Sequence, residues 1–568
     1  MALLVGVGAV LFWPALTTSF FLDDYLQSAM VHGRFPGIRG PFALYDFVAD
    51  DNRQALFEHG FLPWWTDPAL TLRFLRPLSS ALLFYEHTFI GAHPFVMHLH
   101  SFAWWVAAVF AARSFFRRCV TPRAAAFATV MFALAPCHAL PIGWLANREA
   151  LISLTFGTLG LTGLLRWQRG DGARWAALSF LAFSVALAAG EYALACGGFV
   201  VAFVWRGPPM RPGTATRRGG LWLFAVPSAA YLIARGTLGY GAVASGFYQD
   251  PLRDTWLFLR HVPWRLASLT LWGWFSQDPS TWRWGDMSWP VGVAAGLGLF
   301  GLRAALLHVT ATQQPEARKA TWTLVWGVFL SLFPLLAVVP SVRLVGVPML
   351  GIAPVVGVML EAAWFARETE ARHGVEEWTA IAATLLGFAH LVHGPGRGYV
   401  NARQIHTYAA EFEQHASELA KRVEGRVAPE IVVVRGLDDI FVYGFALEAL
   451  GVHDPRLTVL THTGHVLCLR TDDDTLDIHL AADSGMYPVS VGDLYRGELR
   501  PAMPGDVFTT ATFAATVTDV TSNGPRAARF QFSTDLDDPR RMWVGESRTR
   551  GFYDAPPPKV GFGEPFDP

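Results

Sequence analysis

The segment Phe20-Phe21-Leu22-Asp23-Asp24-Tyr25 ends an apolar run that covers residues 3–21. A run of that length is enough to cross a lipid bilayer as a helix. Two adjacent carboxylates at the boundary of hydrocarbon are costly unless they are solvated, paired or used in chemistry. Any spanning helix must also end in polar residues, so a solvated helix end would look the same. The segment therefore predicts a first membrane span and leaves two interpretations of the acidic pair open.

The composition extends this prediction to most of the chain. Of the 568 residues, 52% are apolar and only 16% are charged, and there are 22 Trp and 42 Phe. A chain of this kind must be solvated largely by lipid. We expect a mostly α-helical, polytopic membrane protein.

The charge and the cysteines argue against two other classes of protein. The formal net charge of -1 offers no general basic surface for nucleic acid. The cysteines are scattered and form no CxxC pair, which argues against a disulfide framework and a thiolate metal site. They are Cys119, Cys137, Cys196 and Cys468.

The apolar runs predict about eleven spans. Residues 1–20 lack a basic leader and a small-x-small cleavage site, so we expect them to be a retained first span rather than a signal peptide. Residues 256–275 are interrupted by charged residues and rich in Trp, which predicts an interfacial or re-entrant segment. The predicted spans are 3–21, 96–113, 124–142, 149–166, 175–190, 192–205, 220–235, 289–307, 321–340, 343–364 and 377–393.

The distribution of basic residues predicts the orientation of these spans. With the N-terminus in the cytoplasm, every loop assigned to the inside is basic, as the positive-inside rule requires. This arrangement places the first loop, residues 22–95, and everything after residue 394 outside the cytoplasm. The inside loops contain Arg113, Arg117, Arg118, Arg123, Arg166, Arg169, Arg174, Arg206, Arg211, Arg217, Arg218, Arg303, Arg318, Lys319, Arg367 and Arg372.

The same orientation gathers several ionisable groups at the outer face. Acids and cations from distant parts of the chain at one membrane level are what a cleft for an anionic lipid substrate needs, because neither charge is tolerated alone in hydrocarbon. These residues are Asp23, Asp24, Arg76, His98, His100, Arg148, Glu191 and Arg343.

Four of these residues, Arg76, His98, His100 and Glu191, also have a simpler explanation. Arg76, before Pro77, could anchor at lipid headgroups instead of binding a phosphate. His98 and His100 are two positions apart and do not share a helix face, so we expect structural roles rather than a joint metal site. Glu191 interrupts an apolar run and needs a partner; an ion pair with Arg148 or Arg343 would suffice.

Five short motifs follow one another in the first part of the chain. They are Leu22-Asp23-Asp24-Tyr25, Arg73-Phe74-Leu75-Arg76-Pro77-Leu78-Ser79, Gly91-Ala92-His93-Pro94-Phe95-Val96-Met97-His98-Leu99-His100, Trp144-Leu145-Ala146-Asn147-Arg148-Glu149-Ala150-Leu151 and Ala188-Ala189-Gly190-Glu191. Their order and spacing resemble the GT-C superfamily of polytopic glycosyltransferases, most closely its protein O-mannosyltransferase-like branch. The resemblance covers roughly residues 1–365.

The resemblance implies a fold of many helices with a large first loop. It also implies transfer of a sugar from a polyprenyl-phosphate carrier to an acceptor on the outer side. The acid that follows the first span in this superfamily serves as general base, which corresponds here to Asp23 or Asp24.

Two positions depart from the superfamily's pattern. The acid that matches Glu191 usually follows a Lys, but here it follows Gly190. An Arg-Tyr motif near the tenth span is replaced by Val342-Arg343-Leu344. The tetratricopeptide repeats of some relatives are absent, which weakens any inference about a protein acceptor.

The residue types fit this chemistry independently. Displacing a lipid phosphate from an anomeric carbon with inversion needs a base on the acceptor hydroxyl and cations on the departing phosphate. Asp23 or Asp24 can supply the base, with Tyr25, His98, His100 and Glu191 in support. Arg76, Arg148 and Arg343 can supply the cations. No cofactor is specified; the acidic pair could recruit a divalent cation but does not by itself define a metal site.

The chain changes character after the last predicted span. Residues 395–425 are amphipathic and predict a juxtamembrane helix. Residues 426–568 predict an extracytoplasmic domain that begins as α/β and continues as mostly β-strands. Asp472-Asp473-Asp474 lacks the Gly and Glu of a calcium loop and predicts a turn. The tail from Pro556 is expected to be poorly ordered. An acceptor-binding role and a docking role of the domain are both open hypotheses.

Two other functions stay open at this point. A transporter or flippase of lipid-linked substrates would place ionisable groups near the bilayer midplane and often show inverted repeats. A non-catalytic membrane scaffold would tolerate replacement of both Asp23 and Asp24.

Overall fold

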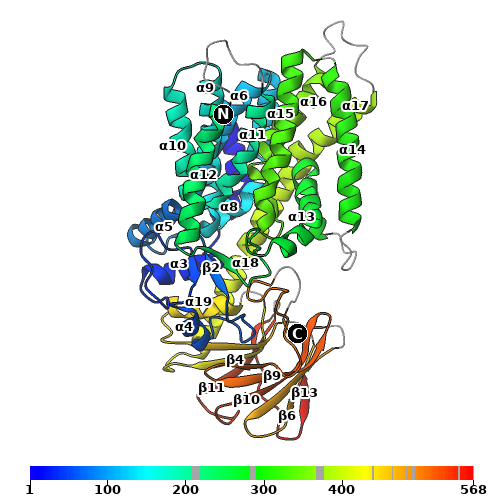
Figure 1. Cartoon of the computed structure of the whole chain (residues 1–568). Helices are drawn as coiled ribbons and strands as arrows, with labels where there is room; N and C mark the ends of the chain where they lie inside the picture. The colour runs from blue at the N-terminus through cyan, green and yellow to red at the C-terminus, as the bar shows by residue number, and fades with distance from the viewer. Residues whose placement is uncertain are drawn as a thin grey trace.

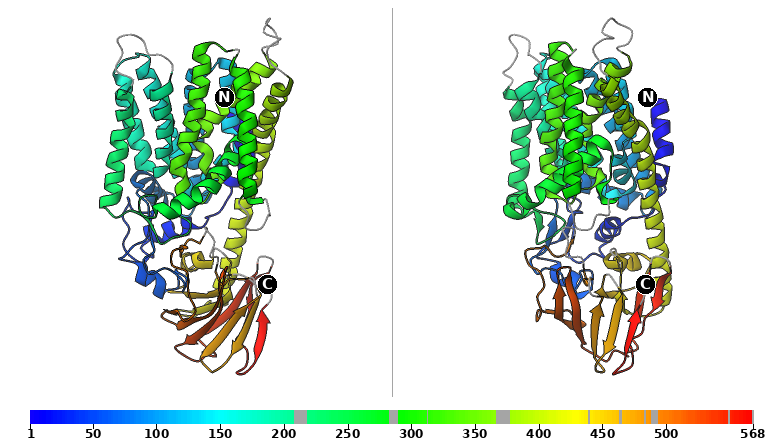
Figure 2. Two further views of the ribbon diagram at one scale, coloured as in Figure 1. Left: turned by 45° about the vertical axis from the view of Figure 1, so that its right-hand side comes forward. Right: turned by 90° about the vertical axis from the view of Figure 1, so that its right-hand side faces the viewer.

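The computed structural model describes a helical bundle and a β-rich C-terminal domain, with the first loop between them (Figure 1). The two further views keep this arrangement, with the C-terminal domain at one end of the bundle (Figure 2). The residues that the structure describes are 1–207, 218–281, 289–311, 313–365, 377–437, 440–462, 465–481, 484–487, 493–547 and 550–566.

The bundle is built from apolar helices, several of them bounded by proline or glycine. The α-helices that form it are α1 (Ala2–Leu11), α2 (Trp13–Leu16), α6 (Pro94–Cys119), α7 (Pro122–Ala133), α8 (Ala139–Gly143), α9 (Glu149–Gln168), α10 (Arg174–Ala189), α11 (Cys196–Arg206), α12 (Gly219–Thr237), α13 (Thr255–Phe275), α14 (Trp289–Ala311), α15 (Pro315–Leu332), α16 (Met349–Trp364) and α17 (Glu377–Phe388).

Short 3-10 turns interrupt the bundle where the polar residues lie. Because such a turn breaks the regular helical ladder, it can bring backbone N–H groups and side chains toward one point. The turns that matter for the site are η2 (Leu145–Asn147), η3 (Glu191–Ala195), η5 (Phe333–Ala337) and η6 (Val342–Gly346).

Four helices in the described part of the chain are long and apolar enough to cross a membrane: Pro94–Cys119, Leu145–Gln168, Trp289–Ala311 and Pro315–Ala337. The bent pair Pro122–Ala133 and Pro136–Gly143 would make a fifth. The count of about eleven spans therefore stays a prediction. Of the basic residues used for topology, Arg211, Arg217, Arg367 and Arg372 lie outside the described residues.

The segment 256–275, predicted to be interfacial or re-entrant, is one helix, α13. It is 21 residues long and contains Pro263 in its interior. It is long enough to cross a membrane but is not among the four helices that are also apolar enough. Figure 1 shows α13 in the half of the bundle that is nearer the C-terminal domain.

The first loop folds as a small layer rather than an irregular connection. It contains α3 (Asp23–Val31), β1 (Asp46–Val48), α4 (Arg53–Glu58), β2 (Thr71–Arg73) and α5 (Pro77–Phe89). Strands β1 and β2 pair antiparallel, and β2 also pairs with β3 (Gly241–Val243), which follows α12. This sheet brings the loop after α12 beside the first loop, although about 170 residues separate the paired strands β2 and β3 along the chain.

The C-terminal domain contains two sheets. The mixed sheet has the order β12-β11-β4-β5, with β4 parallel to both neighbours, and α19 (Tyr443–Ala449) connects β4 to β5. The antiparallel sheet has the order β13-β6-β7-β10-β9-β8. The strands are β4 (Glu430–Arg435), β5 (Arg456–Thr461), β6 (Val466–Arg470), β7 (Thr475–Leu480), β8 (Val507–Thr509), β9 (Phe513–Thr521), β10 (Gly524–Phe532), β11 (Arg541–Ser547), β12 (Gly551–Asp554) and β13 (Gly563–Phe566).

The C-terminal tail differs from the sequence prediction. We expected the chain after Pro556 to be poorly ordered, but β13 adds an edge strand that pairs with β6 from Gly563–Leu469 to Phe566–Val466. Backbone pairing with an existing sheet does not depend on an apolar side-chain pattern, so composition alone could not reveal this strand.

The first loop and the C-terminal domain share one hydrophobic core. Buried Tyr45, Trp64 and Trp65 belong to the same cluster as Val432 and Phe530. The indole N–H of Trp64 donates to the carbonyl of Leu460 at 3.1 Å. Phe61 stacks on Phe445 with ring centroids 4.2 Å apart, so the two regions pack as one body.

One long helix, α18 (Gly394–Arg422), connects the bundle to the domain. Its buried residues recur every three or four positions and make one apolar face, as the sequence pattern predicts. They include Ala402, Ile405, Ala409, Phe412, Ala416 and Leu419. Figure 2 shows α18 running from the side of the bundle down to the strands.

Candidate active site

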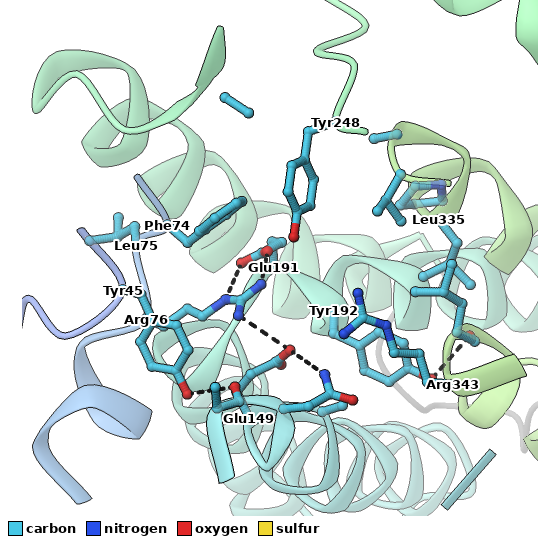
Figure 3. A pocket seen from close by; sticks show the side chains of 18 of the residues that line it. Tyr45, Phe74, Leu75, Arg76, Glu149, Glu191, Tyr192, Tyr248, Leu335 and Arg343 are labelled. Atoms are coloured by element: carbon cyan, nitrogen blue, oxygen red, sulfur yellow. Dashed lines mark hydrogen bonds and ion pairs between the residues drawn. The ribbon is translucent and has the colours of Figure 1, made fainter. Parts of the chain in front are cut away.

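A cavity of 170 Å³ lies where the first loop, the bundle and the loop after α12 meet. Its wall contains seven charged side chains and four tyrosines, which is unusual for a site next to membrane helices. Figure 3 shows the side chains of 18 of the lining residues from close by and labels ten of them. The charged residues are Asp23, Arg76, Glu149, Glu191, Arg235, Asp250 and Arg343; the tyrosines are Tyr45, Tyr192, Tyr231 and Tyr248.

The two aspartates of the opening segment have different surroundings. Asp24 is fully buried, and its carboxylate accepts hydrogen bonds from the backbone N–H groups of Ala146 at 2.9 Å, Phe21 at 3.0 Å and Leu145 at 3.4 Å. It does not line the cavity. Asp24 therefore joins the start of α3 to η2, and both of its carboxylate oxygens already accept hydrogen bonds from the backbone.

Asp23 lines the cavity and is partly exposed. Burial raises the pKa of Asp23 to about 6, while the positive charges of Arg343 and Arg76 oppose this rise. The preceding residue, Leu22, has a φ of 45°, which is rare for a side chain that is not glycine. Such a backbone persists only where the surrounding structure holds it, and here the hydrogen bonds of Asp24 do so.

Arg76 is held by two carboxylates on the floor of the cavity. Its Nε donates to Glu191 Oε2 at 3.0 Å and its Nη2 to Glu191 Oε1, and its Nη1 lies 3.5 Å from Glu149 Oε1. The guanidinium also lies 4.9 Å from the ring centroids of both Tyr45 and Phe74. Figure 3 shows Arg76 between the two glutamates.

This arrangement corrects one expectation. The partner of Glu191 is Arg76, neither Arg148 nor Arg343. The two residues are 115 positions apart in the chain, so no local pattern predicts their pairing. Because two carboxylates balance the positive charge of Arg76, its attraction for an anionic ligand is weaker.

Arg343, unlike Arg76, has no carboxylate partner among the described residues. Within the described ranges, its guanidinium makes no hydrogen bond and no ion pair with a carboxylate. It lies 5.1 Å from the ring centroid of Trp144, and an aromatic face can hold a guanidinium without neutralising it. Its position on η6, opposite Arg76 in Figure 3, leaves its charge available to a ligand.

Arg148, by contrast, does not line the cavity. It is 1% exposed, and it donates to Glu86 Oε2, to Ser101 Oγ at 2.8 Å and to the carbonyl of Met97 at 2.7 Å. A guanidinium whose donors are committed in this way has a structural role. The structure therefore separates Arg148 from the other two arginines predicted to bind a phosphate.

Both histidines face structural partners, in different directions. The Nδ1 of His98 is 2.8 Å from the carbonyl of Ile142. His100 contacts Glu86 through Nδ1 and accepts from the indole N–H of Trp104 at 2.9 Å. Neither residue lines the cavity.

Tyr25 also lies away from the cavity. Its ring centroid is 5.3 Å from that of Phe412 on α18 and 5.9 Å from that of Phe20. It packs α3 against α18, so its contribution to the site is indirect.

Several lining residues were missed in the sequence. Tyr45 donates its hydroxyl hydrogen to the carbonyl of Ala146 at 2.9 Å, and Arg235 pairs with Asp250 at 2.9 Å. Arg235 at the end of an apolar helix was a detectable signal, because ionisable groups in apolar segments usually have a function or a partner. Tyr248 lies in a segment without any motif, and only the fold brings it to the cavity.

The described residues contain no group of three His, Cys, Asp or Glu side chains that could hold a metal ion. Asp24, one of the two predicted ligands for a divalent cation, is already engaged by backbone N–H groups.

No family model matches the chain, and no curated protein matches it. Solved structures with a similar arrangement include ArnT from Cupriavidus metallidurans bound to undecaprenyl phosphate, with 15% sequence identity and a TM-score of 0.39. That alignment covers 80% of this chain and 85% of ArnT.

Two further similar structures are longer than this chain. The oligosaccharyltransferase AglB from Archaeoglobus fulgidus, in complex with an inhibitory peptide and a dolichol-phosphate, has 13% identity and a TM-score of 0.43, over 80% of this chain and 64% of AglB. The arabinofuranosyltransferase AftD from Mycobacteria has 14% identity and a TM-score of 0.32, over 77% of this chain and 31% of AftD. At this level of similarity, the functional assignment rests on the residues of the cavity.

Proposed function

We propose that the chain is an integral-membrane glycosyltransferase. It transfers a sugar from a polyprenyl-phosphate donor to an acceptor hydroxyl at the extracytoplasmic face, with inversion. The observation that carries the proposal is that two side chains of opposite charge line one cavity: Asp23, whose carboxylate makes no hydrogen bond or ion pair within the described ranges, and Arg343, whose guanidinium has no carboxylate partner there. The motif order in the sequence supports the same reaction.

In this proposal Asp23 acts as the general base. It takes the proton of the acceptor hydroxyl while the hydroxyl oxygen forms a bond to the anomeric carbon of the sugar. The bond between that carbon and the phosphate oxygen breaks, and its electron pair leaves with the phosphate. A lipid phosphate is a weak base, so its departure needs no second acid.

Arg343 stabilises the charge that develops on the leaving phosphate. A guanidinium can offer two parallel donors to phosphate oxygens, and in a site shielded from water this contribution is large. Arg76 has a different task. Held by Glu191 and Glu149 and stacked on two rings, it keeps its charge at a fixed place near Asp23, where it favours the ionised carboxylate.

The proposal is tested by incubating the purified protein in lipid nanodiscs with a panel of labelled polyprenyl-phosphate sugars. We expect Asp23→Asn to lower the transfer rate by about 10²–10⁴-fold, the usual contribution of a general base. Asp50→Asn is the matched control, because Asp50 is an exposed acid of the same loop whose partner is Arg53.

Unchanged transfer by Asp23→Asn would rule out the proposed base. Absence of transfer from every donor, combined with movement of a lipid-linked sugar between the leaflets, would favour the alternative of a flippase. Activity that is lost equally in Asp23→Asn and Asp50→Asn would point to damage to the first loop rather than to loss of a base.

A further inference from the structure

The loop that supplies Tyr248 to the cavity lies between two other segments of the chain. On one side, the N–H groups of Gly246 and Phe247 both donate to the carbonyl of Asp493, at 2.7 Å and 3.1 Å. On the other side, the N–H of Gln249 donates to the carbonyl of Ala337 at 2.8 Å. The loop is therefore tied both to the C-terminal domain and to the bundle.

The contact with the C-terminal domain is reciprocal and close. The N–H of Gly497 donates to the carbonyl of Ala244 at 2.9 Å, so residues 244–247 and 493–497 bind each other at both ends. A Cβ added at Gly246 would lie 2.8 Å from the carbonyl oxygen of Asp493. Even alanine at position 246 would push the two backbones apart.

The loop also stores strain at the point of contact. Ala244 has a φ of 60°, in the left-handed region that residues with a Cβ avoid. A strained residue persists where its surroundings determine its conformation, and the bond from Gly497 reaches the carbonyl of this residue. The C-terminal segment thus stabilises a backbone that the loop alone would not favour.

Side chains anchor the C-terminal segment to the first loop. Arg496 is buried and donates through Nε to the carbonyl of Trp65 at 2.6 Å. The N–H of Asp67 donates to the carbonyl of Tyr495 at 3.0 Å, and Arg500 lies 3.2 Å from the Asp67 carboxylate. These bonds keep residues 493–500 at a fixed distance from the site.

Tyr248 connects this contact to the charged floor of the cavity. Its ring centroid is 4.9 Å from that of Phe74, and the same Phe74 lies 4.9 Å from the guanidinium of Arg76. Figure 3 shows Tyr248 entering the cavity from the side opposite Glu149. A shift of the loop would therefore move both the wall and the packing of Arg76.

We propose that the C-terminal domain completes the donor pocket: residues 493–497, anchored by Arg496, hold the loop of residues 244–249 so that Tyr248 forms one wall of the cavity. Arg496 and Gly246 are positioning residues, since neither lines the cavity. This inference rests on the proposed function. It assigns the domain a role inside the transfer site, in addition to any role in binding the acceptor.

The test is Gly246→Ala, which inserts one methyl group between the loop and the carbonyl of Asp493. We expect the KM for the donor to rise and kcat/KM to fall by about tenfold or more, because a displacement near 1 Å at a site can cost up to about 10²-fold. Gly40→Ala is the matched control: Gly40 lies in the first loop, and a Cβ there would meet no atom within 4 Å.

Arg496→Gln should have the same effect as Gly246→Ala. Arg496→Lys should recover part of the affinity for the polyprenyl-phosphate sugar, because its ammonium group can again donate a hydrogen bond to the carbonyl of Trp65. In both Gly246→Ala and Arg496→Gln, amide hydrogen exchange of residues 241–250 should become faster. The affinity for polyprenyl phosphate without a sugar, measured by native mass spectrometry, should fall in parallel.

Hydrogen exchange and lipid binding separate this inference from the proposed function. If the wild-type protein transfers no sugar but the variants loosen the loop and weaken polyprenyl-phosphate binding, the reaction is wrong and the positioning role holds. If the wild-type protein transfers sugar while Gly246→Ala matches Gly40→Ala in KM and in exchange, the positioning role is wrong.

Discussion

Asp23 and Asp24 are adjacent in the chain but meet opposite environments, because successive residues at the start of a helix point about 100° apart. Asp24 accepts three backbone hydrogen bonds and is sealed from the cavity, whereas Asp23 opens into it. The first carboxylate of the pair is therefore the candidate base, and the second fixes the turn that presents it.

The raised pKa of Asp23 predicts a pH dependence. A base must be deprotonated, so kcat/KM should be low at acidic pH and rise through the pKa of about 6. Because the charge of Arg343 holds this pKa down, Arg343→Gln should move the acidic limb of the profile to higher pH, in addition to weakening donor binding.

The measurement is a pH series of kcat/KM for the wild-type protein, Arg343→Gln and Arg318→Gln. Arg318 is an exposed residue near the start of α15, whose other end leads through η5 to the cavity, so its substitution should leave the limb in place. An acidic limb that stays at the same pH in Arg343→Gln would contradict the electrostatic link to Asp23.

At the scale of elements, ion pairs fasten helices that local sequence patterns leave independent. Arg148, at the start of α9, meets Glu86 of α5 and Ser101 of α6. His100 of α6 meets the same carboxylate. Three helices are therefore joined around one buried acid of the first loop.

Removing one member of this cluster should be costly. Arg148→Gln leaves Glu86 without its main cation, and breaking a buried pair from one side costs about 3–5 kcal/mol. We expect a clearly lower midpoint of thermal unfolding in detergent. The double variant Glu86→Gln/Arg148→Gln should be less destabilised than Arg148→Gln, since no unpaired charge remains; equal loss in both would argue against an ion pair.

Part of this architecture was predictable from the sequence, for identifiable reasons. The apolar face of α18 and the strands β4 and β5 follow simple periodic patterns of residues. The acidic pair at the end of the first apolar run also pointed to the cavity. Strand β13 and the three-stranded sheet of the first loop were not predictable, because they depend on pairing with distant strands.

The different roles of the three arginines were also not predictable from the sequence. Arg76, Arg148 and Arg343 all lie near the ends of apolar runs, so the sequence treats them alike. Only the fold shows that Arg148 meets Glu86, that Arg76 meets two glutamates and that Arg343 rests on an aromatic ring. Tyr248 reaches the cavity only because β3 pairs with β2 and the C-terminal domain binds the loop that follows.

At the scale of the whole molecule, the orientation in the membrane remains a prediction. The basic loops predict that residue 215 faces the cytoplasm and residue 400 the opposite side. Reporters of compartment, such as a phosphatase and a fluorescent protein, fused at these two positions should give opposite signals. Reporters that indicate the same side would contradict the count of about eleven spans.

The length and continuity of α18 have a geometric consequence. Its 29 residues, at 1.5 Å each, span about 44 Å without a break. The helix therefore sets both the distance and the rotation between the bundle and the C-terminal domain. One inserted residue would move the domain by about 1.5 Å along the helix axis and turn it by about 100°. Insertions and deletions in this helix are thus constrained by angle as well as by length, because residues 493–497 contact the loop of residues 244–247 at hydrogen-bonding distance.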